Sequence, residues 1–238
     1  MKKKSLAIIL MTTLILALTV ISVSADNICG DNLTWTLKSS TGVLTISGTG
    51  DMTNFESLKT PWYSNRAKVK SIVIKNGVTS IGRAAFKELE NLTTVTIPES
   101  VTTIDVSAFE YCVKLTDITI PDGVKVIGDF AFNGCSVLAS IEIPDSVTKI
   151  GRYAFDGTRY YNSNWENNVL YIGNHLISTD SSISGSCVIK EGTRCIADYT
   201  FSNRKNMTAV TIPDTVTSIG DHAFDGCSGL TNLNIPGN

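Results

Sequence analysis

The stretch LTDITIPDGVKVIGDFAFNGC, from Leu115 to Cys135, decides the fold because close copies of it recur along the chain. Successive copies begin 23 residues apart, except for one step of 46 residues, which is twice that period. A fixed period in this range indicates a solenoid, in which each repeat forms one coil and buries its apolar side against its neighbours. The copies begin at Val69, Leu92, Leu115, Leu138, Ser184, Met207 and, as a fragment, Leu230.

Each coil carries the same apolar pattern. Counted from Leu115 as position 1, apolar residues occupy positions 1, 4, 6, 10, 13, 17, 18 and usually 21. The alternation at positions 3 to 6, with Ile118 and Ile120 facing inward, predicts a short strand that ends at the proline of position 7. A second extended segment is expected at positions 10 to 13. The glycine that usually follows at position 14 is expected to adopt a positive φ angle.

The Ala-Phe pair at positions 17 and 18 predicts a short helical turn that places its phenylalanine at the centre of the coil. Stacked coils would then bring Phe109, Phe132 and Phe155 one above another as a continuous spine. Each buried ring would contribute roughly 1.5–3 kcal/mol. The whole interpretation therefore requires these rings to lie in one column.

The pattern L-x-x-I-x-I-P-x-x-V-x-x-I-G-x-x-A-F-x-x-C, as it stands from Leu115 to Cys135, resembles the BspA-like leucine-rich repeat family. The match runs from about Val69 to the end, some seven-tenths of the chain. The resemblance implies a right-handed leucine-rich-repeat solenoid with a parallel β-sheet on one side and short strands or helical turns on the other. It also implies a secreted or surface protein, mainly bacterial, with roles in adhesion and protein binding. The chain departs from the better known leucine-rich type, because Pro and Gly replace the Asn at the turn of the coil.

The first 25 residues predict a secretory signal peptide. Lys2 to Lys4 form its positive start, residues 6–21 its apolar core, and residues 23–25 (Val-Ser-Ala) a small-residue cleavage pattern. The alternative is an uncleaved membrane anchor. No second apolar stretch approaches the roughly 20 residues that span a bilayer. We therefore expect an exported chain with no membrane insertion after cleavage, secreted and associated with the cell surface.

Two segments depart from the repeat. Residues 26–68 predict a β-hairpin over residues 33–47 that caps the first coil of a repeat region spanning residues 69–238. Residues 161–183 keep the length of one coil but predict a hairpin around Gly173-Asn174, so this coil is either degenerate or an insertion. The partial repeat 230–238 leaves an apolar end open, which suggests a fragment or a chain that continues past Asn238.

The six cysteines divide into two groups. Cys112, Cys135 and Cys227 share position 21 of their coils, a column that also accepts leucine, and are expected to be free buried thiols. Cys187 falls in an inward column and Cys195 in an outward one, so a bridge between them is not expected. The partner of Cys29, if there is one, stays open.

The outward columns of the main strand give a candidate binding face. Positions 3 and 5 carry short, mostly hydroxyl-bearing side chains, which suit recognition of a protein at the surface of a host or of the cell, but equally suit a solvated sheet. The candidate residues of this face are Thr94, Thr96, Asp117, Thr119, Ser140, Glu142 and Thr211. We expect a monomer that binds proteins without cofactors.

Enzymatic chemistry has little support. His175 and His222 lie in different coils without a nucleophile at a recognisable spacing, and no phosphate loop or zinc pattern occurs. The recurring aspartates are explained by the recurring turns. The chain has 20 basic and 22 acidic residues, which gives a net charge of -2, so a nucleic-acid partner is not expected. No catalytic, cofactor-binding or metal-binding residue is predicted.

Two alternative functions remain open. Aromatic residues cluster where the regular coil fails, and such side chains often anchor ligands, although packing over the interrupted core is the favoured interpretation. A glycan-binding module would use Tyr160, Trp165 and Tyr171 as a stacking platform, with Tyr161 in the same patch. The other alternative is a structural spacer within a longer surface protein.

Overall fold

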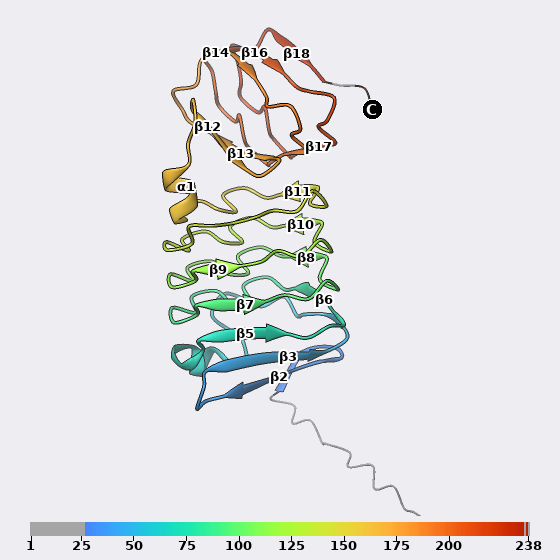
Figure 1. Cartoon of the computed structure of the whole chain (residues 1–238), viewed down its shortest axis with the longest axis vertical. Helices are drawn as coiled ribbons and strands as arrows, with labels where there is room; N and C mark the ends of the chain where they lie inside the picture. The colour runs from blue at the N-terminus through green and yellow to red at the C-terminus, as the bar shows by residue number, and fades with distance from the viewer. Residues whose placement is uncertain (1–26, 236, 238) are drawn as a thin grey trace, which may run out of the picture.

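The computed structural model describes residues 27–235 and 237, and Figure 1 shows a solenoid made of two stacks of coils. We call residues 27–156 the N-terminal stack, residues 157–183 the bend segment and residues 184–235 the C-terminal stack. The expected signal peptide, residues 1–25, lies outside the described residues.

Two sheets run along the N-terminal stack, one from each extended segment of the coil. The main sheet has the order β1-β2-β3-β5-β7-β9, and the second sheet has the order β11-β10-β8-β6-β4. Neighbouring strands are parallel except at β1–β2 and β2–β3, where the hairpin expected over residues 33–47 forms. The main-sheet strands are β1 (Ile28–Gly30), β2 (Leu33–Lys38), β3 (Val43–Gly48), β5 (Ser71–Ile74), β7 (Thr94–Thr96) and β9 (Asp117–Ile118). The second-sheet strands are β4 (Gly50–Asp51), β6 (Val78–Ile81), β8 (Thr103–Ile104), β10 (Val126–Ile127) and β11 (Lys149–Ile150).

An aromatic spine fills the N-terminal stack, and this confirms the prediction from the Ala-Phe pairs. The rings of Phe109, Phe132 and Phe155 are fully buried, and successive ring centroids lie 5.4 Å apart. Phe86 continues the column, and Trp62 stacks on it at 5.5 Å. Trp62 lies just before a 3-10 helix over Tyr63–Lys68 and donates its indole N–H to the carbonyl of Ala85 at 3.0 Å. The spine thus extends to the end of the stack that the hairpin occupies.

The turn of the coil confirms one prediction and corrects another. The Ala-Phe pairs lie in short hydrogen-bonded turns, as expected. The glycines at position 14 do not have positive φ angles; those angles occur at positions 16 and 20, for example 56° at Phe130 and 71° at Gly134. Glycine is required at position 14 because the preceding coil passes too close: a Cβ on Gly151 would lie 2.4 Å from the backbone nitrogen of Asp129.

The bend segment replaces one coil with a short helix and a hairpin. It contains α1 (Arg159–Ser163), β12 (Val169–Ile172) and β13 (His175–Thr179). The hairpin with its turn at Gly173-Asn174 forms as predicted. However, β13 pairs with β15 (Cys195–Ile196), and the sheet has the order β12-β13-β15-β17. The hairpin therefore joins the sheet formed by the second extended segments of the coils, and it adds no strand to the main sheet of either stack.

The C-terminal stack runs in a different direction from the N-terminal stack. In Figure 1, β14 (Gly185–Val188), β16 (Met207–Thr211) and β18 (Asn232–Asn234) succeed one another across the top, whereas β3, β5 and β7 succeed one another upward. The sheet that contains β13, β15 and β17 (Ser218–Ile219) lies against the last coil of the N-terminal stack. The solenoid axis therefore turns at the bend segment.

This central sheet is a wall shared by two hydrophobic cores. Ile177, Cys195 and Ala197 belong to the core of the N-terminal stack, whereas Leu176 and Ile196 belong to that of the C-terminal stack. Because side chains alternate across a strand, one strand can serve both cores. The sequence placed Cys195 in an outward column; it is buried because the N-terminal stack covers that side, with its thiol 3.6 Å from the carbonyl of Thr148.

The cysteine column at position 21 has a structural role. The thiols of Cys112, Cys135 and Cys227 each donate to the carbonyl of the phenylalanine 26 residues earlier, at 3.1, 3.2 and 2.9 Å. Cys112 and Cys135 are buried and Cys227 is partly exposed, and all six cysteines are free in the described residues. Burial raises the pKa of Cys135 to about 12, so this thiol is not a ready nucleophile.

Candidate functional site

The candidate binding face is present as an exposed strip along the N-terminal stack. Thr94 and Thr96 lie on β7 and Asp117 lies on β9, and all three side chains are exposed. The alternate residues, such as Val95 and Ile118, point into the core and are buried. Thr119 is exposed beside Asp117 on the same coil, and the exposed Ser140 and Glu142 extend the strip to the next coil. We call these six residues the front face.

The seventh predicted residue, Thr211, does not join that strip. It lies on β16, in the main sheet of the C-terminal stack, where the direction of stacking has changed (Figure 1). The main sheet of the N-terminal stack ends at β9, and a separate sheet of order β14-β16-β18 begins beyond the bend. The single continuous face expected from the sequence is therefore divided into two faces with different orientations.

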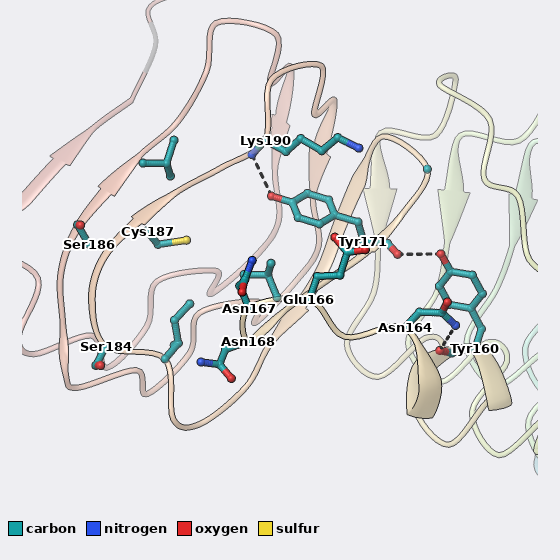
Figure 2. A pocket seen from close by; sticks show the side chains of 14 residues that line it. Tyr160, Asn164, Glu166, Asn167, Asn168, Tyr171, Ser184, Ser186, Cys187 and Lys190 are labelled. Carbon is teal, nitrogen blue, oxygen red and sulfur yellow. Dashed lines mark hydrogen bonds between the residues drawn. The ribbon is translucent and has the colours of Figure 1, made fainter.

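The predicted aromatic patch is also divided. Tyr160 and Tyr171 line a hollow of about 720 Å³ between the bend segment and β14. Both hydroxyls form hydrogen bonds within the protein, as Figure 2 shows. The hydroxyl of Tyr160 donates to the carbonyl of Tyr171, and the hydroxyl of Tyr171 accepts the backbone N–H of Lys190 at 3.0 Å. These two tyrosines form a wall of the hollow and not an open stacking platform.

Tyr161 and Trp165 line a second hollow of about 490 Å³. Their rings meet edge to face with centroids 5.3 Å apart. The structure adds Tyr153 and Tyr199, with the guanidinium of Arg152 4.4 Å from the first ring and 4.8 Å from the second. The proposed platform of Tyr160, Trp165 and Tyr171 is thus not assembled, and Trp165 instead lines a hollow together with Tyr153, Tyr161 and Tyr199.

Tyr153 and Tyr199 were not predicted as possible ligand contacts, although the sequence contains a signal for them. Both occupy position 16, as do Phe130 and His222, and the chain has a positive φ angle at each. The rings pair along this column, Phe130 with Tyr153 at 5.5 Å and Tyr199 with His222 at 4.9 Å. A bulky residue with positive φ is uncommon. An aromatic column at a strained turn position could therefore have been noticed.

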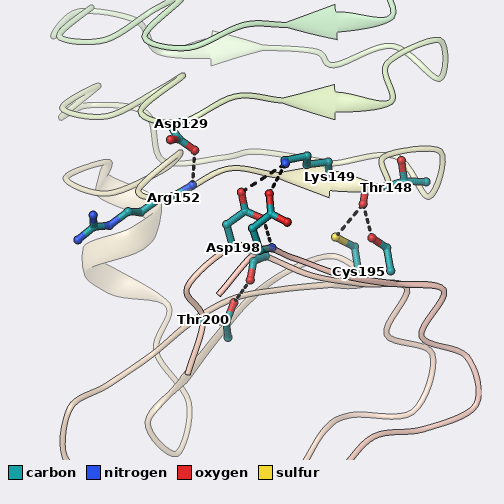
Figure 3. A network of polar contacts seen from close by, with 10 residues as sticks. Asp129, Thr148, Lys149, Arg152, Cys195, Asp198 and Thr200 are labelled. Atoms are coloured by element: carbon teal, nitrogen blue, oxygen red, sulfur yellow. Dashed lines mark hydrogen bonds and ion pairs between the residues drawn. The ribbon is translucent and has the colours of Figure 1, made fainter. Parts of the chain in front are cut away.

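The bend is held by a polar network between the two stacks, shown in Figure 3. Lys149 on β11 forms an ion pair with Asp221 at 2.6 Å, and its ammonium lies 4.0 Å from the carboxylate of Asp198. The hydrogen bond with Asp221 raises the pKa of Lys149 and lowers that of Asp221. Burial raises the pKa of Asp198, whose carboxylate accepts the backbone N–H of Asp221 at 2.8 Å.

His175 is the other polar group at the bend. It is fully buried at the start of β13, and its Nε2 donates to the carbonyl of Pro144 at 3.2 Å. Its Nδ1 has no hydrogen-bond partner among residues 27–235 and 237, and burial lowers its pKa. A neutral imidazole wedged between the stacks indicates packing and not acid–base chemistry.

The described residues contain no group of three or more His, Cys, Asp or Glu side chains placed to hold a metal ion. In the same ranges, no helix is long and apolar enough to cross a membrane. Neither observation assigns an activity.

The repeat itself assigns the family. The model of the BspA type leucine-rich repeat region matches residues 56–184 and 178–238 in six copies. The chain belongs to the BspA-type leucine-rich repeat family. Membership of this family suggests a surface-type binding or repeat protein, and the family and its fold are generally non-enzymatic.

Solved structures of bacterial leucine-rich repeat proteins are similar to the chain. A leucine-rich repeat protein from Eubacterium ventriosum is 28% identical over 87% of this chain and 70% of its own, with a TM-score of 0.49. A leucine rich cell surface protein from Faecalibacterium prausnitzii is 22% identical over 88% and 76%, with a TM-score of 0.35. The pneumococcal vaccine antigen PcpA is 17% identical over 88% and 70%, with a TM-score of 0.39. No curated protein sequence matches the chain significantly.

Proposed function

We propose that this protein is an exported, surface-associated binding protein that recognises another protein through the front face. The observation that carries the proposal is the alternation on β7 and β9, where buried Val95 and Ile118 hold the backbone while exposed Thr94, Thr96 and Asp117 face outward. Short side chains lose little rotamer entropy on binding, so a rigid sheet that presents them binds at low entropic cost. The family supports the same class of function.

The chemistry at one end of the front face favours a basic partner. Thr119 and Glu142 line a shallow hollow of about 340 Å³ with Glu99 and Asp122. Three carboxylates around one hollow form an acidic margin beside the hydroxyl strip. A partner with Lys or Arg next to small polar groups would be complementary to this arrangement.

The experiment compares two triple variants of residues 26–238 on a panel of purified matrix and cell-surface proteins. Thr96→Lys, Thr119→Lys and Glu142→Lys together reverse the charge and crowd the front face. The matched control, Thr102→Lys, Thr217→Lys and Glu90→Lys, makes the same charge change at exposed positions away from it. Loss of binding only in the front-face variant supports the proposal. Unchanged binding of that variant to every partner found would contradict it.

Glycan binding is a second candidate, favoured by the rings around Trp165. Tyr153, Tyr161 and Tyr199 surround the same hollow, and aromatic faces can stack on sugar rings. A glycan array with wild type, Trp165→Ala and Tyr153→Ala tests it. Sugar binding that both variants lose supports this function, and no binding to any glycan argues against it.

A further inference from the structure

The main sheet of the C-terminal stack begins with an edge strand that lacks the neighbour expected from the repeat. By the 23-residue period, positions 3 to 6 of the coil before β14 fall at residues 163–166. In the structure these residues are the end of α1 and the loop after it. Nothing in the described chain pairs with β14 on that side, because the sheet order is β14-β16-β18.

The backbone of β14 shows which groups are left open. The N–H groups of Gly185 and Ile189 point to β16, where they donate to the carbonyls of Asn206 and Thr211 at 2.9 and 3.0 Å. Backbone groups alternate sides along a strand, so those of Ser186 and Val188 point away from β16. Among residues 27–235 and 237, neither of these two N–H groups has an acceptor.

The hydroxyl of Tyr171 marks the end of this open edge. It accepts the N–H of Lys190 at 3.0 Å and so satisfies the next donor on the same side of the chain, as Figure 2 shows. A side-chain oxygen thus takes the place that a carbonyl of a neighbouring strand would occupy. The open edge therefore ends before Lys190, and within β14 it comprises Ser186 and Val188, a length that a short peptide strand can cover.

A groove runs along this edge, formed by the hollow of about 720 Å³ between β14 and the bend segment. We call it the β14 groove. Its floor is apolar, with Ile183 and Cys187 almost fully buried beside Val169. Its rim is polar and exposed, and Val188 stands above it with 74% of its surface accessible. The polar rim residues are Asn164, Glu166, Asn167, Asn168, Ser186 and Lys190.

We infer that the β14 groove binds an extended segment of a partner protein, which adds to the sheet as the missing strand beside β14. The unpaired N–H groups of Ser186 and Val188 would donate to its backbone, which is the usual basis of recognition by strand addition. Its side chains would alternate, one set on the apolar floor near Cys187 and the other beside Val188. The bend segment forms the opposite wall, so the groove suits one strand and not the edge of a second sheet.

This site lies apart from the front face, so the inference does not rest on the proposed function. The test begins with random octapeptides displayed on phage and selected on residues 26–238. Selected peptides are expected to alternate apolar and polar residues, and a synthetic copy should slow the amide hydrogen exchange of Ser186 and Val188. Selection without any binder, or binders that leave both amides exchanging as before, would overturn the inference.

Variants then separate backbone pairing from other contacts. Val188→Pro removes the groove-facing N–H without removing a donor to β16, and is expected to weaken the selected peptide by about tenfold or more, the equivalent of one lost strand contact. Val188→Thr keeps the N–H and the branched side chain and should stay within about threefold. Equal binding by the proline variant, if folded, contradicts the inference.

A gain of affinity provides a test that loss of folding cannot imitate. Tyr171→Phe removes the hydroxyl that occupies the N–H of Lys190, so the open edge gains a third donor. The selected peptide should bind this variant more tightly and slow the exchange of the Lys190 amide as well. The front-face triple variant should bind the peptide like wild type. Weaker peptide binding to Tyr171→Phe would show that the phenol is a ligand contact and would reject the strand model.

Discussion

The N-terminal and C-terminal stacks are built from the same 23-residue coil, but their cores are enclosed differently. In the N-terminal stack, Trp62 covers one end of the aromatic spine and the central sheet, β12-β13-β15-β17, covers the other. Phe132 lies between these ends with no exposed surface. In the C-terminal stack, Phe201 stacks on Phe224 at 5.1 Å, but Phe224 remains partly exposed. The burial of the core in a coil of this type therefore depends on the elements that pack against both of its sides.

The largest expected effect comes from deleting a ring in each stack. Phe132→Ala removes a buried ring with neighbours at 5.4 Å on both sides, and should lower the free energy of unfolding by about 3–5 kcal/mol. Phe224→Ala removes a ring with one neighbour and some exposure, and should cost about half as much. Urea unfolding of both variants measures the two values. Equal losses would show that enclosure does not distinguish the stacks.

A glycine pair gives the next largest effect. A Cβ on Gly151 or on Gly220 would lie 2.4 Å from a backbone nitrogen of the coil before it, so alanine forces the backbone to move. Gly151 is buried beneath the central sheet, so Gly151→Ala should lower the free energy of unfolding by about 1–3 kcal/mol. Gly220 is only partly buried, so its coil can shift outward and the loss should be smaller.

The measurement is again the midpoint and slope of urea unfolding. The structure gives both glycines the same contact distance, so any difference between the variants reports how freely each coil can move. A greater loss for Gly220→Ala would contradict this view of the C-terminal stack.

These glycines also show what the sequence could and could not predict. The period, the inward columns and the phenylalanine spine follow from the recurrence of one pattern along the chain, so the sequence predicts them. The need for glycine at position 14 was predicted, but its cause was wrong, because the close contact at Gly151 comes from the neighbouring coil. The sequence around a residue does not show which backbone atoms of the neighbouring coil will approach it.

The arrangement at the bend could be predicted only in part, because it also depends on contacts between coils. The hairpin around Gly173-Asn174 was predicted from local turn chemistry and is present. Its pairing with β15 depends on the direction of the second stack, which no local pattern states. The burial of Cys195 and the division of the front face from Thr211 follow from that direction, so both differ from the prediction.

The pH dependence of stability should report the boundary between the stacks, with an effect smaller than either core substitution. Burial holds the pKa of His175 below its unfolded value near 6.5. As pH falls below 6.5, the unfolded chain binds a proton that the folded chain does not, so the free energy of unfolding decreases until the folded pKa is reached. Above 6.5 the contribution of His175 is constant.

The test compares unfolding at pH 7.5 and 5.5 for wild type, His175→Gln and His222→Gln. A glutamine at 175 can still donate to the carbonyl of Pro144 but does not titrate, so part of the loss on acidification should disappear. His222 is exposed on the last full coil, so His222→Gln serves as the control for replacing a histidine outside the buried boundary. If His175→Gln loses as much stability on acidification as wild type, the imidazole does not sense pH at the bend.

The smallest effect should be the same in both stacks. Thr116 donates its hydroxyl to the carbonyl of Thr93 at 3.2 Å, and Thr231 donates to that of Thr208 at the same distance, each 23 residues earlier. Both bonds are exposed, so water competes for them, and Thr116→Val or Thr231→Val should cost about 0.5 kcal/mol or less. Urea unfolding should give equal values within error. Because these bonds depend only on the adjoining coil, equality here together with a large difference between Phe132→Ala and Phe224→Ala would locate the contrast between the stacks in the enclosure of the core. A clear loss for Thr231→Val alone would instead show that the outer hydroxyl bonds hold the last coil in place.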